Sequence, residues 1–202
     1  MSFAIEHTMW AVFMLLLLSG RGMSSTISRF TNIRCEVIEP TFVAFDQCEL
    51  KMLGRGIVGL NLRAQLLKDS FTKAKVNLCL YRKFSGYRPF IFNVTFDFCK
   101  LVAKSNDNLS FQKIYFDAVA SKSNLNHSCP FEVCCKNEES IASLSFPFQR
   151  EIIVQNFVFK DEFLKYLPLP TGEYQVQLTA GVDNEWKGKV SVHILIHDNN
   201  NK

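Results

Sequence analysis

The 202-residue chain lacks the residue patterns that mark common catalytic sites. It has no Gly-x-Ser-x-Gly motif, no phosphate-binding glycine-rich loop and no His-Glu-x-x-His motif. Histidine is scarce, and the two histidines that share a strand face, His193 and His197, have no carboxylate or cysteine at a spacing that completes a metal site. The sequence therefore predicts no catalytic residue, no metal ligand and no cofactor, and we expect that the protein is not an enzyme.

Long hydrophobic runs are also missing. Met9 to Leu18 is an unbroken apolar run of ten residues, which is the length of a signal-peptide core and too short to cross a bilayer. The residues before it include Glu6 and His7 but no Lys or Arg, and charges interrupt every later apolar run. We expect a signal peptide over residues 1–23, with secretion of residues 24–202 as one soluble domain.

Secretion would expose the cysteines to an oxidising compartment, where thiols pair. The number of cysteines is odd, so at least one is left outside an intramolecular pair. The adjacent Cys134 and Cys135 are poorly suited to pair with each other, because the small ring strains the peptide bond between them. They can instead end two different bridges or form an intermolecular link. The seven cysteines are Cys35, Cys48, Cys79, Cys99, Cys129, Cys134 and Cys135.

Apolar and polar residues alternate along most of the chain, which is typical of strands with one buried face. One segment differs, because apolar residues recur from about Ser110 to Ala120 at the spacing of a short amphipathic helix, with Ser110 as its N-cap. Pro168 and Pro170 predict that the following strand pairs only after Gly172. The pattern indicates an all-β antiparallel sandwich with one short helix, with strands over 30–37, 42–53, 57–66, 74–81, 88–99, 174–180 and 190–196.

The strand over 88–99 carries phenylalanines on a single face. Phe90, Phe92, Phe96 and Phe98 share one face with Val94, and Asn93, Thr95 and Asp97 are among the residues on the other face. Two interpretations are open: the stripe fills a core, or it forms one wall of a cavity. Its opposite face carries Asn93, one of three N-glycosylation sequons; the other two are at Asn108 and Asn126.

Positive charge is concentrated in the stretch from Arg63 to Arg88, although the formal net charge of the whole chain is only +4. Seven basic residues stand against the single acid Asp69, so the stretch is either a solvated sheet face or a surface for a membrane, a receptor or another anionic partner. For a secreted chain we expect no nucleic acid partner. The basic residues are Arg63, Lys68, Lys73, Lys75, Arg82, Lys83 and Arg88.

Residues 133–149 fit neither a strand nor a helix. Every valine codon begins with GT, so Val133 can encode the start of an intron. "FPF" at 146–148 can be encoded by a run of pyrimidines and Gln149 by CAG, which together match the end of an intron. The segment is either a true insertion or a retained intron, in which case the working protein joins Glu132 to Arg150.

Five stretches of the sequence resemble a large insect family of small secreted proteins of unknown function. That family includes or borders the CheB chemosensory proteins and is related to the ML lipid-recognition superfamily. The resemblance spans about residues 30 to 196. Its stretches are "FTNIRCEV" (30–37), "GYRPFIFNVTFDFCKLV" (86–102), "SNLNHSCPF" (123–131), "IIVQNFVF" (152–159) and "LPLPTGEYQVQL" (167–178).

This resemblance implies an immunoglobulin-like, ML-like sandwich with four paired cysteines, Cys35, Cys48, Cys99 and Cys129. Sequence does not choose among the three pairings, and we favour Cys35 with Cys48 and Cys99 with Cys129. Cys79 departs from the family pattern. It shares the polar face of its strand with Lys75, Asn77 and Tyr81, and it is either a free thiol or a partner for Cys134 or Cys135.

The resemblance further implies a lipid or long-chain apolar ligand held between two sheets, in a chemosensory context. The alternative is a glycosylated extracellular interaction module with a filled core. The oligomeric state is not predicted. The expected cavity residues are Val58, Leu60, Leu62, Leu78, Phe90, Phe92, Val94, Phe96, Phe98, Tyr174, Val176, Leu178, Val192 and Ile194.

Overall fold

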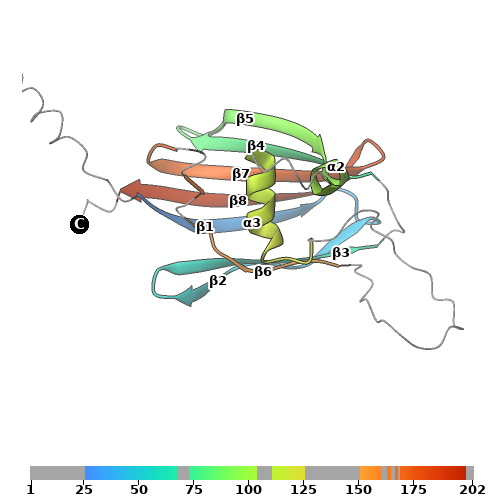
Figure 1. The fold of residues 1–202 in the computed structure, drawn as a ribbon, viewed down its shortest axis with the longest axis horizontal. Coiled ribbons are helices and arrows are strands. Elements are labelled where there is room, and N and C mark those ends of the chain that lie inside the picture. Colours follow the sequence, from blue (N-terminus) through green and yellow to red (C-terminus); the bar gives the residue numbers. More distant parts are fainter. Residues whose placement is uncertain are drawn as a thin grey trace, which may run out of the picture.

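The chain folds into two antiparallel sheets that face each other (Figure 1). The structure, a computed structural model, describes residues 26–67, 73–103, 111–125, 151–160, 163–164, 167 and 169–198. Within them, the strands are β1 (Thr26–Val37), β2 (Val43–Gly54), β3 (Ile57–Leu66), β4 (Lys75–Lys83), β5 (Tyr87–Asp97), β6 (Glu151–Phe157), β7 (Gly172–Val182) and β8 (Glu185–Asp198). The helices are α2 (Phe98–Ala103) and α3 (Phe111–Ala120). The predicted all-β sandwich is confirmed.

The two sheets differ in width. The large sheet has five strands in the order β1-β8-β7-β4-β5, and the small sheet has three in the order β2-β3-β6. All pairings are antiparallel, so residues opposite each other on neighbouring strands share a face. Because the small sheet has three strands and the large sheet has five, the small sheet is the narrower of the two.

The predicted elements are present, with four differences. α2 is a second helix that was not predicted, and β7 pairs from Gly172 itself, which lies opposite Ile196. β6 was not predicted as a strand, and the strand predicted to continue through Cys99 ends at Asp97. A carboxylate oxygen of Asp97 accepts a hydrogen bond from the backbone N–H of Lys100 at 3.1 Å, which caps α2 and starts the helix at Phe98. Phe98 therefore belongs to a helix and not to the stripe on β5.

The predicted helix is confirmed as α3, although its proposed cap, Ser110, lies outside the described residues. The chain after α3 continues alongside β6: the backbone N–H of Gln155 donates to the carbonyl of Lys122 at 2.9 Å, and that of Ile153 donates to Asn124 Oδ1 at 2.8 Å. These bonds fix α3 to the edge of the small sheet. In the described part of the chain, no helix is long and apolar enough to cross a membrane.

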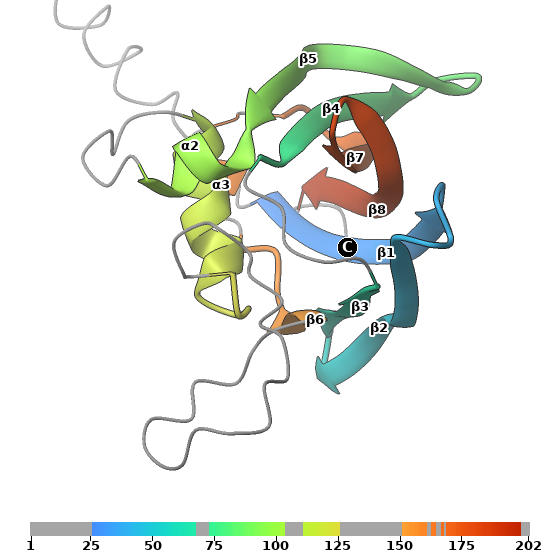
Figure 2. The ribbon, with the colours of Figure 1, turned by 90° about the vertical axis from the view of Figure 1, so that its right-hand side faces the viewer.

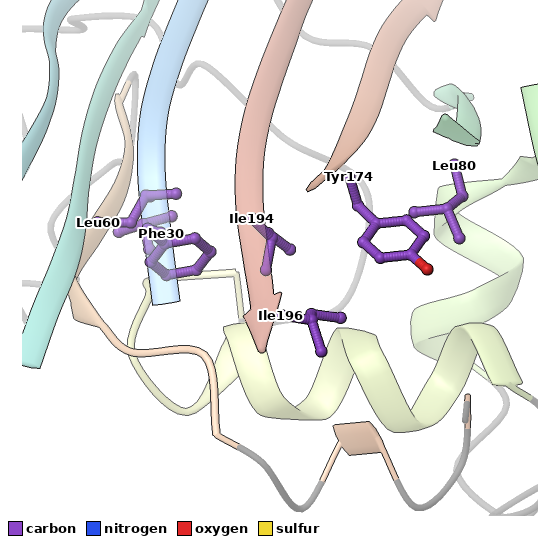
Figure 3. Close-up of a cluster of buried hydrophobic side chains, with 7 residues drawn as sticks. Phe30, Leu60, Leu80, Tyr174, Ile194 and Ile196 are labelled. Carbon is purple, nitrogen blue, oxygen red and sulfur yellow. The ribbon is translucent and has the colours of Figure 1, made fainter. Parts of the chain in front are cut away.

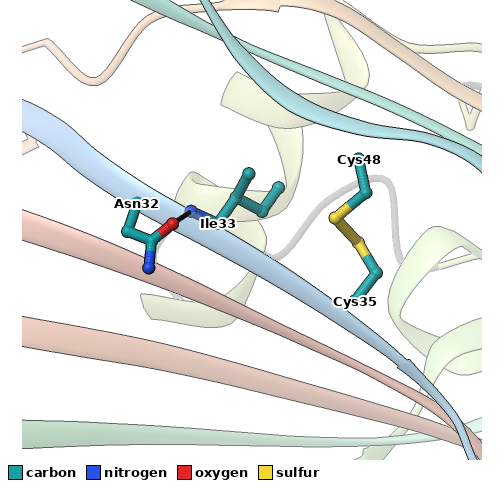
Figure 4. The surroundings of a disulfide bond; sticks show 4 residues. All are labelled: Asn32, Ile33, Cys35 and Cys48. Atoms are coloured by element: carbon teal, nitrogen blue, oxygen red, sulfur yellow. Dashed lines mark hydrogen bonds between the residues drawn. A yellow bond between two sulfur atoms is a disulfide. The ribbon is translucent and has the colours of Figure 1, made fainter.

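A disulfide joins the two sheets on one side. Cys35 of β1 and Cys48 of β2 are bonded, with their Cα atoms 6.2 Å apart (Figure 4). The bond holds β1 and β2 together on this side, where the two strands lie next to each other (Figure 2). On the other side α2 and α3 stand between β5 and the small sheet (Figure 2). The sandwich is therefore a wedge that is narrow at the disulfide and wide at the helices.

The buried core has two clusters. The first lies between the sheets near the start of β1 and consists of Phe30, Leu60, Leu80, Val154, Tyr174, Ile194 and Ile196. The second lies at the opposite end of β2 and β3 and consists of Phe42, Val43, Ala64, Leu66 and Val182. Gly188 faces the second cluster, and a Cβ there would lie 3.3 Å from Val43 Cγ1, so β8 and β2 approach closely at this point.

Candidate ligand site between the sheets

One half of the interior is filled by side chains. Tyr174, Leu80 and Ile196 are each at most 1% exposed, and they lie together above α3 (Figure 3). The Tyr174 hydroxyl donates to the carbonyl of Pro170 at 2.7 Å, so its single polar atom is satisfied inside the core. This half has the close packing of an ordinary sandwich.

The other half contains the second core cluster and the buried Val76, but a row of inward side chains on the large sheet there is less covered. Val94, Leu78, Leu178 and Val190 form a continuous row across four strands, because Leu78 lies opposite both Val94 and Leu178, and Leu178 lies opposite Val190. All four point inward, yet none is fully buried, and Leu178 is 39% exposed. Leu178 is on β7, the middle strand of the large sheet, where an inward leucine in a filled sandwich would be buried.

The same partial exposure extends to neighbouring inward positions. Val176 and Val192 lie opposite each other in the next row, and Phe96 lies beside Val76 near the end of β5. We refer to this surface as the inner-face patch. It consists of Leu78, Val94, Phe96, Val176, Leu178, Val190 and Val192.

The two helices bring aromatic rings together beyond the end of β5. Phe98 of α2 and Phe116 of α3 meet edge to face, with their centroids 5.5 Å apart. Lys113 Nζ lies 5.3 Å from the centroid of the Phe116 ring and pairs with Asp117 at 2.6 Å. The Lys113 side chain is mostly covered, with 14% of it exposed, whereas the Asp117 side chain is 53% exposed.

The structure divides the predicted cavity residues among three places. Leu60, Tyr174 and Ile194 are core residues, and six more are partly buried against that core, of which the last two also belong to the inner-face patch: Val58, Leu62, Phe90, Phe92, Val176 and Val192. Leu78, Val94, Phe96 and Leu178 belong to the inner-face patch outside both core clusters, and Phe98 lies on α2. Val190 was missed, although it alternates with Val192 and Ile194 and could have been found by the same spacing.

A separate cleft lies at the outer end of the filled half. It has a volume of about 420 Å³, within the range of small-molecule sites. Two cations, Arg29 and Lys160, contribute to its wall, and Phe30, Val58 and Phe159 contribute apolar surface. The remaining lining residues are Ser28, Gly56, Ile57 and Val158. Among the predicted cavity residues, only Val58 lines this cleft.

The cysteines agree with the predicted pairing as far as they are described. The Cys35–Cys48 bond is confirmed. Cys99 is in a disulfide whose partner lies outside the described residues. Cys129, Cys134 and Cys135 also lie outside them. Residues 133–149 are outside them as well.

Cys79 is a free thiol, one of the two states proposed for it. It lies on the outward face of β4, opposite Asn93 and Gln177, but it is only 1% exposed. A hydrogen bond with the Cys79 thiol, together with burial, raises the pKa of the Tyr81 hydroxyl. The polar face is thus covered at its centre by long neighbouring side chains.

The outward face also holds His193. Its Nδ1 lies 2.9 Å from the Tyr87 hydroxyl, and burial lowers the pKa of the imidazole. Within the described ranges no three His, Cys, Asp or Glu side chains come together as a metal site.

Of the three sequons, only the one at Asn93 is described. Asn93 is exposed on β5, and Asn77 Nδ2 donates to Asn93 Oδ1 at 2.8 Å and to Thr95 Oγ1 at 3.0 Å. Asn108 and Asn126 lie outside the described residues.

The predicted basic stretch does not form a single surface. Arg63 lies on the small sheet near Glu151, whereas Lys75 lies over the Trp186 ring at the start of β4. Lys83 and Arg88 lie at the other end of β4, and Lys68 is outside the described residues. The charge is therefore distributed over both ends of the sandwich.

The fold and the inner-face patch define a small antiparallel β-sandwich protein with a partly open apolar interior. Residues 76–137 match the family model described as "Protein of unknown function (DUF1091)", which covers less than half of the chain. The match begins in β4 and includes β5, the two strands that carry Leu78, Val94 and Phe96 of the patch, together with α2 and α3. No curated protein matches the chain.

Proposed function

We propose that this protein is a secreted binding protein that holds a lipid or another long-chain apolar molecule between its two sheets. The observation that carries the proposal is the inner-face patch, where Leu178 is 39% exposed on an inward position of a central strand. An apolar chain that covers this patch would gain about 0.8 kcal/mol for each buried methylene. A medium-length chain therefore needs no polar contact to bind tightly.

The wedge supports the same proposal. The Cys35–Cys48 bond holds β1 close to β2, while β5 lies on the side where the helices replace sheet-on-sheet packing. A guest would enter the wide side and lie along β4, β7 and β5. The resemblance to the CheB and ML proteins favours an extracellular, chemosensory role for such a carrier.

The test is displacement of an apolar fluorescent probe, with native mass spectrometry to identify any guest that copurifies. Leu178→Arg places a charge on the patch at a position that is already partly exposed. The matched control is Leu67→Arg, because Leu67 is 51% exposed and lies beyond the end of β3. We expect probe binding to the wild type and the control and at least a tenfold loss in Leu178→Arg, since burying an unpaired charge is costly. Equal binding by both variants, or no binding by the wild type, would contradict the proposal.

A second candidate is a glycosylated extracellular interaction module. The near-complete burial of Tyr174, Leu80 and Ile196 favours it, because these side chains fill their part of the interior themselves. This candidate predicts a protein partner, no retained apolar molecule and no effect of Leu178→Arg on partner binding. Affinity capture from the native secretion, followed by the same variant pair, separates the two functions.

A further inference from the structure

Two hairpin turns lie at one end of the sandwich. The β2–β3 turn spans 54–57 and the β4–β5 turn spans 83–87. Both are at the end where β1 begins and β8 finishes, on the left in Figure 1. The cleft also lies there, since its lining joins Ser28–Phe30 of β1 to Gly56–Val58 of the β2–β3 hairpin. We refer to this part of the molecule as the hairpin end.

Both hairpins expose large apolar side chains. Met52 is 66% exposed and Ile57 is 50% exposed on the first hairpin, while Phe84 is 58% exposed and Tyr87 is 36% exposed on the second. Leu53 is also exposed, but part of its side chain packs on Gly59. A Cβ atom at Gly59 would lie 2.6 Å from Leu53 Cδ1. Apolar groups gathered at protruding turns indicate a surface that is covered in use.

Cations surround these apolar groups. Arg29, Lys51, Arg55 and Arg88 are exposed, and none of them forms an ion pair within the described part of the chain. Lys83 pairs with Glu173 at 2.7 Å. The hairpin end therefore carries more positive than negative charge.

The opposite end carries both paired and unpaired cations. There, Lys187 pairs with Glu185 at 2.5 Å, and Lys189 pairs with Glu36 at 2.6 Å. Apolar residues are exposed at that end too, including Ile38 and Leu67. Lys73 and Lys100 are exposed at that end and likewise form no ion pair within the described residues, so the hairpin end is distinguished by its two protruding apolar tips with cations beside them.

The β4–β5 tip is also held in place from within. The Arg82 guanidinium lies 5.3 Å from the centroid of the Phe84 ring and 5.4 Å from that of Phe90, and it donates to the carbonyl of Thr171 at 3.3 Å. Phe84 is therefore anchored at its base while most of its ring faces solvent. Such a ring is ready to insert without first being ordered.

We propose that the hairpin end docks onto an anionic lipid bilayer. Met52, Ile57 and Phe84 enter the boundary between headgroups and acyl chains, and the surrounding cations contact the headgroups. The exposed cations beside the two tips favour a negatively charged surface as the partner. Two separate protruding tips suit a deformable bilayer better than the flat, continuous contact of a protein partner. This inference does not depend on a guest between the sheets.

The test is cosedimentation of the full disulfide-bonded protein with vesicles. One set is phosphatidylcholine, and the other contains about one third phosphatidylserine. We expect binding to the anionic vesicles alone, with release at about 1 M salt, where the screening length falls to roughly 3 Å. No binding to the anionic vesicles, or equal binding to both sets, would overturn the proposal.

Variants separate the hairpin end from the rest of the surface. Met52→Ser with Phe84→Ser should weaken vesicle binding at least tenfold, and Arg55→Gln or Arg88→Gln about fivefold each. Ile38→Ser with Leu67→Ser is the matched control at the opposite end and should change binding less than twofold. An equal loss in the control, or capture by polyglutamate in place of vesicles, would overturn the proposal. Thermal unfolding of each variant verifies that these exposed substitutions leave the fold intact.

Discussion

Tyr174 and Leu178 project from the same inward face of β7, one fully buried and the other 39% exposed. The two positions are four residues apart, so the degree of filling changes along the strand. Val119 of α3 and Leu167 pack against the cluster that contains Tyr174. Leu178 belongs to neither cluster. The sandwich thus combines a closed core with an apolar surface that the described elements leave partly open.

The closed half should carry most of the stability. Leu80→Ala removes a side chain that is 1% exposed and should lower the free energy of unfolding by about 2–5 kcal/mol, because a cavity remains. Leu178→Ala should cost about 1 kcal/mol, since its side chain is already partly solvated. Urea unfolding of both variants measures the difference. Similar losses at the two positions would contradict a half-open interior.

The disulfide should be a major stabilising link. Cys35 and Cys48 are 13 residues apart, and a loop of this size is expected to contribute about 3 kcal/mol by restricting the unfolded chain. The double variant Cys35→Ala with Cys48→Ala should lose about this amount in urea unfolding. Cys79→Ala, which removes a free thiol, serves as the comparison and should lose clearly less. Equal losses would show that the bond contributes little beyond burial of its sulfurs.

Alternation predicted the strands that have one covered face, and it failed at β6. There, Ile152, Ile153 and Val154 are consecutive apolar residues with no period of two. Val154 is 4% exposed between the sheets, whereas Ile153 lies on the other face and is partly covered there, and its backbone bonds to Asn124 along the edge of the strand. A strand covered on both faces shows no alternation, and its partner segment is distant in sequence.

The sequence predicted which residues face the space between the sheets, but not how deeply each of them is buried. The same pattern places Tyr174 and Leu178 inward, and nothing local to β7 distinguishes them. Their difference depends on where α3 and the edge of the small sheet lie, which is set by long-range contacts. Phe98 was misplaced for a local reason, because Asp97 acts as a helix cap where the alternation alone predicts a continuing strand.

Cys79 should be unreactive in the folded protein. Its side chain is 1% exposed, and buried thiols react slowly with alkylating reagents. Iodoacetamide applied to the native protein should leave Cys79 unmodified, whereas the same treatment in urea should alkylate it fully. Peptide mass spectrometry locates the label. Rapid labelling of Cys79 under native conditions would contradict the buried position.

Asn93 should carry an N-linked glycan when the chain is made in a secretory host. The side chain is exposed on the outward face of β5, and Thr95 completes the sequon. Thr95→Ala should abolish the modification, while Thr95→Ser should retain it because it preserves the acceptor motif. Enzymatic deglycosylation, which converts a glycosylated Asn93 to Asp, reports occupancy by mass. An unmodified Asn93 in the wild type would contradict this prediction.

Tyr115 should make stability depend on alkaline pH. Its hydroxyl donates to the carbonyl of Phe163 at 3.0 Å, and burial raises the pKa of Tyr115 to about 12. The unfolded chain has the ordinary tyrosine pKa of about 10, so above that pH it releases a proton that the folded chain retains. Stability should therefore be unaffected below about pH 10 and fall between about pH 10 and 12, by an amount on the order of 1–2 kcal/mol.

Tyr115→Phe isolates this effect from the other tyrosines. The variant should be less stable at about pH 8, by about 1 kcal/mol, because the hydrogen bond to Phe163 is lost. It has no proton to release, however, so the difference from the wild type should shrink at about pH 11. Tyr81 and Tyr174, whose pKa values are also raised, remain in both proteins and cancel in the comparison. A difference that stays constant or grows with pH would show that the Tyr115 hydroxyl is solvated in the folded state.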